Sequence, residues 1–181
     1  MQASGAVGLA AMQLAAAHGC TVVGTAGTEA GMAAVRASGG LAFNHRTDGY
    51  LQEALAALGD GRKFNVVLEM SAHTNLVSDV GVLAKGGSLV IVVSKDVSVP
   101  FNPRLLMVPE ISVMGTFLGS STADEMKATH TALFTAMSKG TLKPVVGMVL
   151  PLEEAAKAHI EVMTPSSGGA TGNIVLQVRD P

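Results

Sequence analysis

Short apolar runs alternate with longer segments of helical periodicity along most of the chain. This alternation is typical of βαβ units and predicts a mainly parallel sheet. We expect strands over the apolar runs at 21–25, 41–43, 64–69, 88–93 and 111–117. We expect helices over the segments 5–18, 29–38, 48–58 and 75–83, and from 122 to 139.

Some of these segments carry a more specific prediction. The strands at 64–69 and 88–93 are apolar without alternation, as expected when helices cover both faces of a sheet. The helix at 5–18 is apolar nearly all round, which predicts that it is buried. Residues 122–125, Thr-Ala-Asp-Glu, fit a capping box that starts the helix after them.

The pattern changes after residue 140. A strand at 145–150, an amphipathic helix at 152–163 and a strand at 173–178 follow one another. The apolar face of this helix should carry Ala155, Ala156, Ile160 and Met163. We therefore expect a strand–helix–strand segment that is separate from the preceding α/β layers.

The composition adds one unusual feature. The chain has 181 residues, a length that suggests about one domain, and only 14% of them are charged, whereas about 25% is typical. Hydrophobic residues reach 48%, although aromatic residues are only 3%. Two explanations stay open at this point: an alanine-rich core, or a surface that a missing partner should cover.

Several classes of function have no support in the sequence. A net charge of −2 gives no basic footprint for nucleic acid. The single cysteine, Cys20, excludes a disulfide framework within one chain. No apolar run approaches the roughly 18 residues of a membrane span, and the first residues do not resemble a signal peptide. We therefore expect a cytoplasmic protein that has no membrane partner.

A glycine-containing loop, Ala-Ser-Gly-Ala-Val-Gly at 3–8, leads directly into the first helix. Glycines at a strand-to-helix turn let the backbone approach a pyrophosphate, which the helix N-terminus then holds. Gly5 and Gly8 have the spacing of the last two glycines of G-x-x-G-x-x-G, but Gln2 stands where the first should be. Close helix–strand packing would explain the same two glycines without any ligand.

A dinucleotide-binding unit places a strand before this loop, and only Met1 and Gln2 precede Ala3. We therefore expect a Rossmann-like, doubly wound parallel α/β sheet that lacks its first strand, and interpret the chain as a fragment or a truncated product. Uncovered helix faces and strand edges would then add to the low charge content and predict marginal solubility.

The chain resembles the zeta-crystallin, or NADPH:quinone oxidoreductase, branch of the medium-chain dehydrogenase/reductase superfamily. The resemblance covers essentially the whole chain, in order, and leaves out the N-terminal half of that family. It implies a dinucleotide-binding domain over 1–143 and, over 144–181, the C-terminal segment of a GroES-like catalytic domain. Its matching stretches are 3–8, 24–29, 43–46, Glu69-Met70 with Asn75, Gly86-Gly87, 102–104 and 169–172.

The choice of cofactor follows from the residues after the glycine loop. NAD-specific sites carry an acidic residue about 20 positions after the glycine motif. That count reaches 26–28, Ala-Gly-Thr, which has no carboxylate, so NADPH is favoured over NADH. Glu29 follows directly, but its place in the first turn of a helix suits a role in compensating the helix dipole.

The resemblance implies where the cofactor lies. It places Gly27 and His45 beside the adenosine phosphate, where His45 and the following Arg46 could donate to phosphate. It places Asn75, 92–95 and 116–118 on the nicotinamide-ribose side. The implied cofactor-binding residues are Ser4, Gly5, Ala6, Val7, Gly27, His45, Asn75, Val92, Val93, Ser94, Lys95, Thr116, Phe117 and Leu118.

The chain departs from the family pattern in four places. Gln2 and Val93 replace glycines, and Asn173 replaces a common lysine. Residues 31–33, Gly-Met-Ala, occupy a region where related enzymes often carry a lysine. The departures raise the question of whether cofactor binding is weakened.

The resemblance implies reduction of quinones, in one- or two-electron steps, by a zinc-independent enzyme. The five histidines are scattered, so the sequence offers no metal site, and no residue is identified as catalytic. The isolated chain should turn over weakly or not at all, and pairing through the strand at 111–117 would make a homo-oligomer. The alternative is a non-catalytic nucleotide-binding or crystallin-like structural module.

Overall fold

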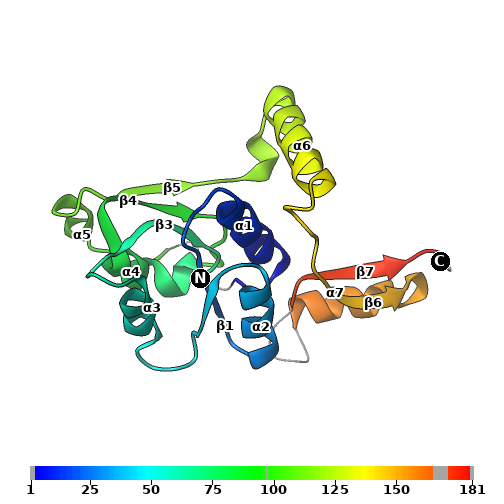
Figure 1. Cartoon of the computed structure of the whole chain (residues 1–181), viewed down its shortest axis with the longest axis horizontal. Helices are drawn as coiled ribbons and strands as arrows, with labels where there is room; N and C mark the ends of the chain where they lie inside the picture. Colours follow the sequence, from blue (N-terminus) through cyan, green and yellow to red (C-terminus); the bar gives the residue numbers. More distant parts are fainter. Residues whose placement is uncertain (1–2, 97, 165–170, 180–181) are drawn as a thin grey trace. The chain divides into compact units, whose positions relative to one another are not determined.

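The computed structural model describes residues 3–96, 98–164 and 171–179. The chain divides into two compact units, which we call unit 1, residues 48–129, and unit 2, residues 2–47 with 130–181. Every strand ladder among the described residues is parallel, which confirms the predicted parallel α/β class (Figure 1). None of the helices in the described residues is both long and apolar enough to cross a membrane.

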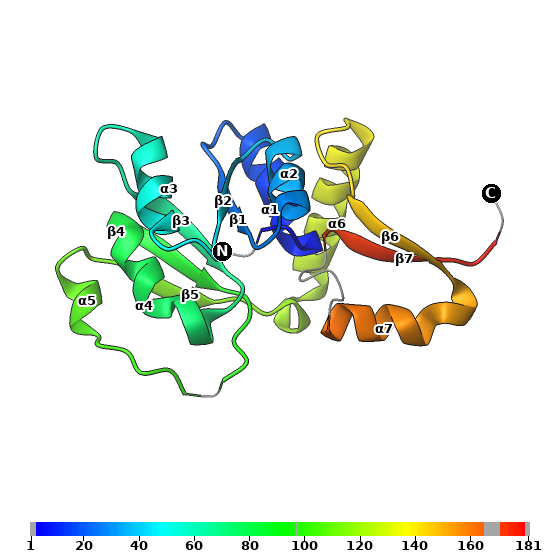
Figure 2. The ribbon, with the colours of Figure 1, turned by 90° about the horizontal axis from the view of Figure 1, so that it is seen from below.

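Unit 1 is built on a three-stranded sheet, in which β4 (Leu83–Ile91) lies between β3 (Phe64–Glu69) and β5 (Ser112–Gly115). Its apolar core includes Val67 of β3, Val80 of α4 and Leu89 of β4, and Figure 2 shows α4 beside these strands. In chain order its elements are α3 (Tyr50–Leu58), β3 (Phe64–Glu69), α4 (Ala72–Val82), β4 (Leu83–Ile91), α5 (Arg104–Met107), β5 (Ser112–Gly115) and η1 (Leu118–Ser120).

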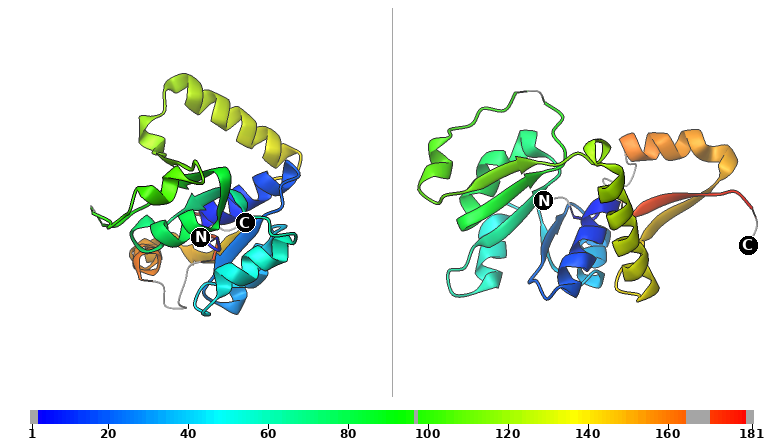
Figure 3. Two further views of the ribbon diagram at one scale, coloured as in Figure 1. Left: turned by 90° about the vertical axis from the view of Figure 1, so that its left-hand side faces the viewer. Right: turned by 90° about the horizontal axis from the view of Figure 1, so that it is seen from above.

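Unit 2 contains two separate pairs of parallel strands. β1 (Val23–Ala26) pairs with β2 (Leu41–Asn44), and β6 (Val146–Pro151) pairs with β7 (Asn173–Gln177). Figure 3 shows α7 running alongside the β6-β7 pair, which is the predicted strand–helix–strand segment. α6 (Ala123–Ser138) carries the chain from unit 1 into unit 2. The other elements are α1 (Ala6–Ala17), β1 (Val23–Ala26), α2 (Glu29–Ala37), β2 (Leu41–Asn44), β6 (Val146–Pro151), η2 (Leu152–Glu154), α7 (Ala155–Met163) and β7 (Asn173–Gln177).

In each unit at least one strand has a neighbour on one side only within the part of the chain that the structure describes. Among the described residues, β1 pairs only with β2, and β3 pairs only with β4. The assignment of 1–143 and 144–181 to two different domains of a larger enzyme stays a prediction.

Burial differs from the sequence prediction at several apolar positions. In α1 the buried residues are Gly8, Leu9 and Met12, whereas Val7 is 53% exposed, so the prediction of all-round burial is wrong within this chain. The strand β3 is also not covered throughout, because Val66 is 62% exposed. Ile160, which was expected on the buried apolar face of α7, is 63% exposed. The buried residue of this helix is Ala158.

Close packing explains one of the two glycines at the start of α1. A Cβ built on Gly8 would lie 2.6 Å from both the Cα and the carbonyl oxygen of Ala3, which are backbone atoms that cannot move aside cheaply. A Cβ on Gly5 would meet no heavy atom within 4 Å. Gly8 is therefore required by the fold, whereas the space beside Gly5 is open.

A pair of carboxyl groups lies in the interior of unit 1. Glu69 at the end of β3 is 0% exposed and Asp79 of α4 is 2% exposed. Burial, together with the hydrogen bond and the negative charge of Glu69, raises the pKa of Asp79 to about 8. At neutral pH Asp79 is therefore protonated.

The contrast between the two glycines gives a prediction about stability. Gly8→Ser should lower the free energy of unfolding by about 1–3 kcal/mol, because its side chain would overlap the backbone of Ala3. Gly5→Ser introduces the same side chain into open space at a favourable N-cap position and should be close to neutral. Urea unfolding of both variants checks this, and equal losses would contradict it.

The carboxyl pair gives a second prediction. Between about pH 5 and 8 Asp79 is protonated in the folded chain but ionised in the unfolded chain, so stability falls as the pH rises, with a slope approaching about 1.4 kcal/mol per pH unit. Asp79→Asn should remove this component, because the amide cannot ionise. Urea unfolding at several pH values measures the slope. The exposed Asp124→Asn should retain it, and identical slopes in both variants would disprove the prediction.

Candidate functional site

The loop before α1 leaves backbone donors at the start of a helix. Gly5 is the N-cap residue in an extended conformation, and no side chain caps the helix. The first turn of α1 contains no acidic residue. The positive end of the helix dipole is therefore not compensated by α1 itself, and the open space beside Gly5 leaves room for an anion.

Two basic side chains lie against Gly27, directly after β1. A Cβ on Gly27 would lie 2.9 Å from Nε2 of His45 and 2.8 Å from Nε of Arg46. The amide of His45 donates to the carbonyl oxygen of Ala26 over 3.2 Å, which fixes this segment to the end of β1. The structure thus brings the predicted residues Gly27 and His45 together.

The surroundings of His45 favour the neutral form of its ring. Burial lowers the pKa of His45, and the positive charge of Arg46 lowers it further. Its Nδ1 atom is buried without a hydrogen-bond partner. The neutral ring therefore predominates at neutral pH in the chain without ligand, and an anion beside it would favour protonation.

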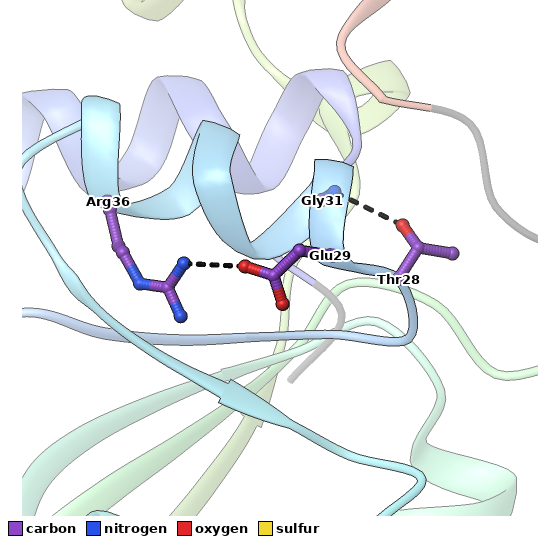
Figure 4. A network of polar contacts seen from close by, with 4 residues as sticks. All are labelled: Thr28, Glu29, Gly31 and Arg36. Carbon is purple, nitrogen blue, oxygen red and sulfur yellow. Dashed lines mark hydrogen bonds and ion pairs between the residues drawn. The ribbon is translucent and has the colours of Figure 1, made fainter.

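Figure 4 shows how the start of α2 is arranged. The side chain of Thr28 caps the helix by accepting a hydrogen bond from the amide of Gly31 over 3.1 Å. The carboxylate of Glu29 forms an exposed ion pair with Arg36 at 2.9 Å. Glu29 thus sits in the first turn of α2, as expected.

Gly31 brings α2 close to the glycine loop. A Cβ at this position would lie 3.1 Å from Cβ of Ser4 and 2.9 Å from Cβ of Ala26. A longer side chain therefore does not fit at Gly31, whereas Ala33 in the same region is exposed, so packing does not explain why the region 31–33 has no lysine.

The C-terminal segment contacts the glycine loop within unit 2. The amide of Gly172 donates to the carbonyl oxygen of Ser4 over 2.9 Å, and Gly172 forms a bridge with Gly5. Asn173, which replaces a common lysine, donates its side-chain amide to the carbonyl oxygen of Val145. Positions 169 and 170 of the matching stretch lie outside the described residues.

The other predicted residues gather in unit 1 at the carboxyl ends of its parallel strands. The segment 92–95 follows β4, and Thr116 follows β5 and donates to the carbonyl oxygen of Ile91 over 3.0 Å. Phe117 and Leu118 are 75% and 69% exposed, and Val93, in place of a glycine, is 42% exposed. Whether this group and the one in unit 2 face the same ligand stays a prediction.

Glu69 connects several of these residues, and the sequence did not identify it as a site residue. Its Oε1 atom accepts hydrogen bonds from the amide of Ser71 and, over 3.2 Å, from the side chain of Asn75. Its carbonyl oxygen accepts from the amides of Val92 and Val93, at 2.9 and 3.4 Å. A charged residue that ends an apolar strand is the signal that could have pointed to it.

The described residues contain no group of three or more histidine, cysteine, aspartate or glutamate side chains that could hold a metal ion. Cavities of about 240 Å³, beside the end of α3, and about 470 Å³, between the ends of α1 and α2 and residues 140–145, are lined by none of the predicted cofactor residues.

Comparisons with known proteins show which family the chain belongs to. Quinone oxidoreductase from Sus scrofa is 42% identical over 96% of this chain and 52% of its own length. The chain therefore spans about half the length of this relative.

Two solved structures share the fold. Quinone oxidoreductase from Thermus thermophilus, solved also with NADPH, has a TM-score of 0.79 and 28% identity over 97% of this chain and 56% of its own. An NAD-dependent alcohol dehydrogenase has a TM-score of 0.83 and 27% identity over 99% of this chain and 50% of its own. Residues 6–135 match the model of a protein family described as zinc-binding dehydrogenase. The chain thus belongs to the zinc-binding dehydrogenase family and forms its Rossmann-like, nucleotide-binding portion.

Proposed function

We propose that this chain is the NADPH-binding part of an oxidoreductase that reduces quinones. The observation that carries this proposal is the placement of His45 and Arg46 against Gly27 at the end of β1. A side chain at Gly27 would displace both groups, so a glycine here keeps two phosphate donors at the position where a nucleotide ribose would lie.

The glycine loop supports the same proposal for the pyrophosphate. Residues 4–7 combine an uncapped helix N-terminus with open space beside Gly5. The backbone donors of this turn suit a diphosphate, which brings two negative charges close to the positive end of α1. Ser4, Gly5, Ala6 and Val7 would therefore hold the pyrophosphate.

The preference for NADPH over NADH rests on the charges around Gly27. Glu29 is occupied by Arg36, and no carboxylate ends β1 to accept a bond from a 2′-hydroxyl. His45 and Arg46 can instead donate to a 2′-phosphate. NADPH fits these residues better than NADH, because only NADPH carries a 2′-phosphate whose oxygens can accept from them.

The nicotinamide side would be formed by residues of unit 1. Asn75, the segment 92–95 and the segment 116–118 lie at or beyond the carboxyl ends of parallel strands, where open α/β sheets bind ligands. NADPH supplies the hydride for the reaction, and the protein residues orient the ring and exclude water.

The acceptor and the assembly are also part of the proposal. Quinone is proposed because the relatives described above carry the name quinone oxidoreductase. We extend the proposal to one- or two-electron, zinc-independent reduction, in agreement with the scattered histidines, and to a cytoplasmic location. Self-association through β5 is supported by its place at the end of the sheet and by Met114, which is 48% exposed.

The cofactor preference gives a prediction. Arg46→Ala should weaken NADPH binding by about 10- to 100-fold, the effect of losing a hydrogen bond to a charged group, and should leave NADH binding unchanged. Titration of the fluorescence of each nucleotide measures both affinities. Arg179→Ala removes an exposed arginine elsewhere and serves as the matched control. A wild-type chain that binds both nucleotides equally would contradict the preference.

His45 gives a prediction about pH. A bound 2′-phosphate would raise the pKa that burial and Arg46 lower in the free chain, so binding takes up a proton. The ratio of NADPH to NADH affinity should therefore rise as the pH falls from 7.5 to 6.5. His45→Gln, which cannot be protonated, should show a ratio that does not change over this range.

Oxidation of NADPH by an ortho-quinone tests the reaction itself. We expect slow turnover, because the chain spans about half the length of its relatives. Tight NADPH binding without any turnover, also in the presence of the remaining half of such an enzyme, would favour a non-catalytic nucleotide-binding module. Absence of nucleotide binding would overturn the proposed function.

A further inference from the structure

The strongest unassigned feature of the described residues is the buried carboxylate of Glu69. Its side chain accepts hydrogen bonds from Ser71 and Asn75, and its backbone carbonyl accepts from Val92 and Val93. One residue thus ties the start of α4 to the loop after β4. Three of its four partners are residues that the sequence placed beside the nicotinamide ribose.

The geometry of Asn75 shows what this contact achieves. The Nδ2 atom of Asn75 donates to Glu69 over 3.2 Å, which fixes the orientation of the amide group. The amide oxygen is then left as the acceptor. An acceptor in a fixed position suits a hydroxyl donor such as those of a ribose.

The second carboxyl group completes the arrangement. Oε2 of Glu69 and Oδ2 of Asp79 are buried, and neither atom has a hydrogen-bond partner of fixed geometry among the described residues. Two adjacent buried carboxylates would repel each other strongly, whereas a protonated Asp79 can donate a hydrogen bond to Glu69. The carboxyl group of Glu69 lies just before the N-terminus of α4.

We propose that Glu69, held by its hydrogen-bonded partner Asp79, is a positioning residue for the nicotinamide side of the cofactor site. The proposal rests on the proposed function, because it assigns a role toward the same cofactor. Glu69 acts through Asn75 and the loop at 92–93, and Asp79 acts through Glu69. Ionisation of Asp79 would remove its donor and place a buried negative charge next to Glu69, which would disturb the orientation of Asn75.

The other ionisable groups around the pair do not replace Asp79 in this role. Tyr50 of α3 stays a neutral phenol, because burial and then the charges of Asp79 and Glu69 raise its pKa. The basic side chains on or next to α4 make contacts elsewhere or are exposed. Lys63 donates to the carbonyl oxygen of Gly81, Lys85 of β4 pairs with Glu110, His73 accepts from the amide of Lys95, and Arg104 of α5 is exposed.

The test measures nucleotide affinity between pH 7.0 and 9.5 for the wild-type chain and two variants. The wild-type dissociation constants for NADPH and for NADH should both rise by about tenfold as Asp79 ionises, because the two nucleotides share the nicotinamide ribose. Asp79→Asn keeps a donor to Glu69 without a charge and should give constants that do not change with pH. Asp124→Asn should behave like the wild type.

A second readout follows the pair without any nucleotide. In protein labelled with ¹³C and ¹⁵N, the carboxyl signal that disappears in Asp79→Asn should titrate near pH 8 in the wild type. The side-chain amide signal of Asn75 should shift with the same midpoint. An Asn75 signal that does not follow this titration would remove the link between the pair and the site.

The outcomes separate the two proposals. Equal pH profiles of affinity in the wild type and in Asp79→Asn overturn the positioning role while leaving the proposed function intact. A folded chain that binds neither nucleotide at any pH overturns the proposed function and, with it, the cofactor role of Glu69. A pH effect on NADPH alone would point to the 2′-phosphate corner and likewise count against the positioning role.

Discussion

Glu69 ends β3 without access to water, and a carboxylate in such a place needs donors that the chain itself supplies. Ser71, Asn75 and the proton on Asp79 meet this need from one helix. These hydrogen bonds hold the start of α4 against the end of β3. The polar interior of unit 1 and the geometry of its candidate site therefore have a common physical origin.

In unit 2 the main constraint is close packing around the backbone. Gly8 allows α1 to lie against Ala3, and Gly24 leaves room for the side chains of Ala3 and Met12. The absence of side chains at these positions brings β1 and the glycine loop together. Gly5 lies in the same loop but has open space beside it, so its role is not explained by packing.

The sequence predicted the regular elements well because their periodicity and their caps are local. The strand at 64–69 has the predicted bounds, and the capping box is present, since Thr122 and Glu125 exchange hydrogen bonds. The strand predicted at 88–93 is β4 and already begins at Leu83, and the short helix α5 lies in a segment for which no element was predicted. β4 contains two adjacent glycines, and prolines lie on both sides of α5. Because both residue types disfavour regular structure, local propensities did not predict these features.

The candidate site was predictable only in part. Resemblance supplied His45 and Asn75, but no local pattern joins Glu69 on a strand to Asp79 in the following helix. Asp79 has the spacing of a polar helix face next to Asn75 and Ser78, and its burial follows only from the way α4 packs. Exposure was misjudged at Val66 and Ile160 because hydrophobicity does not say which surfaces a given chain covers.

The bond between Gly172 and Ser4 joins residues near opposite ends of the sequence. The glycine loop is synthesised long before Gly172, because Gly172 follows it late in the sequence. Closure over such a separation has a high entropic cost and is slow compared with local helix formation. The glycine loop should thus be among the last parts of unit 2 to reach its final form.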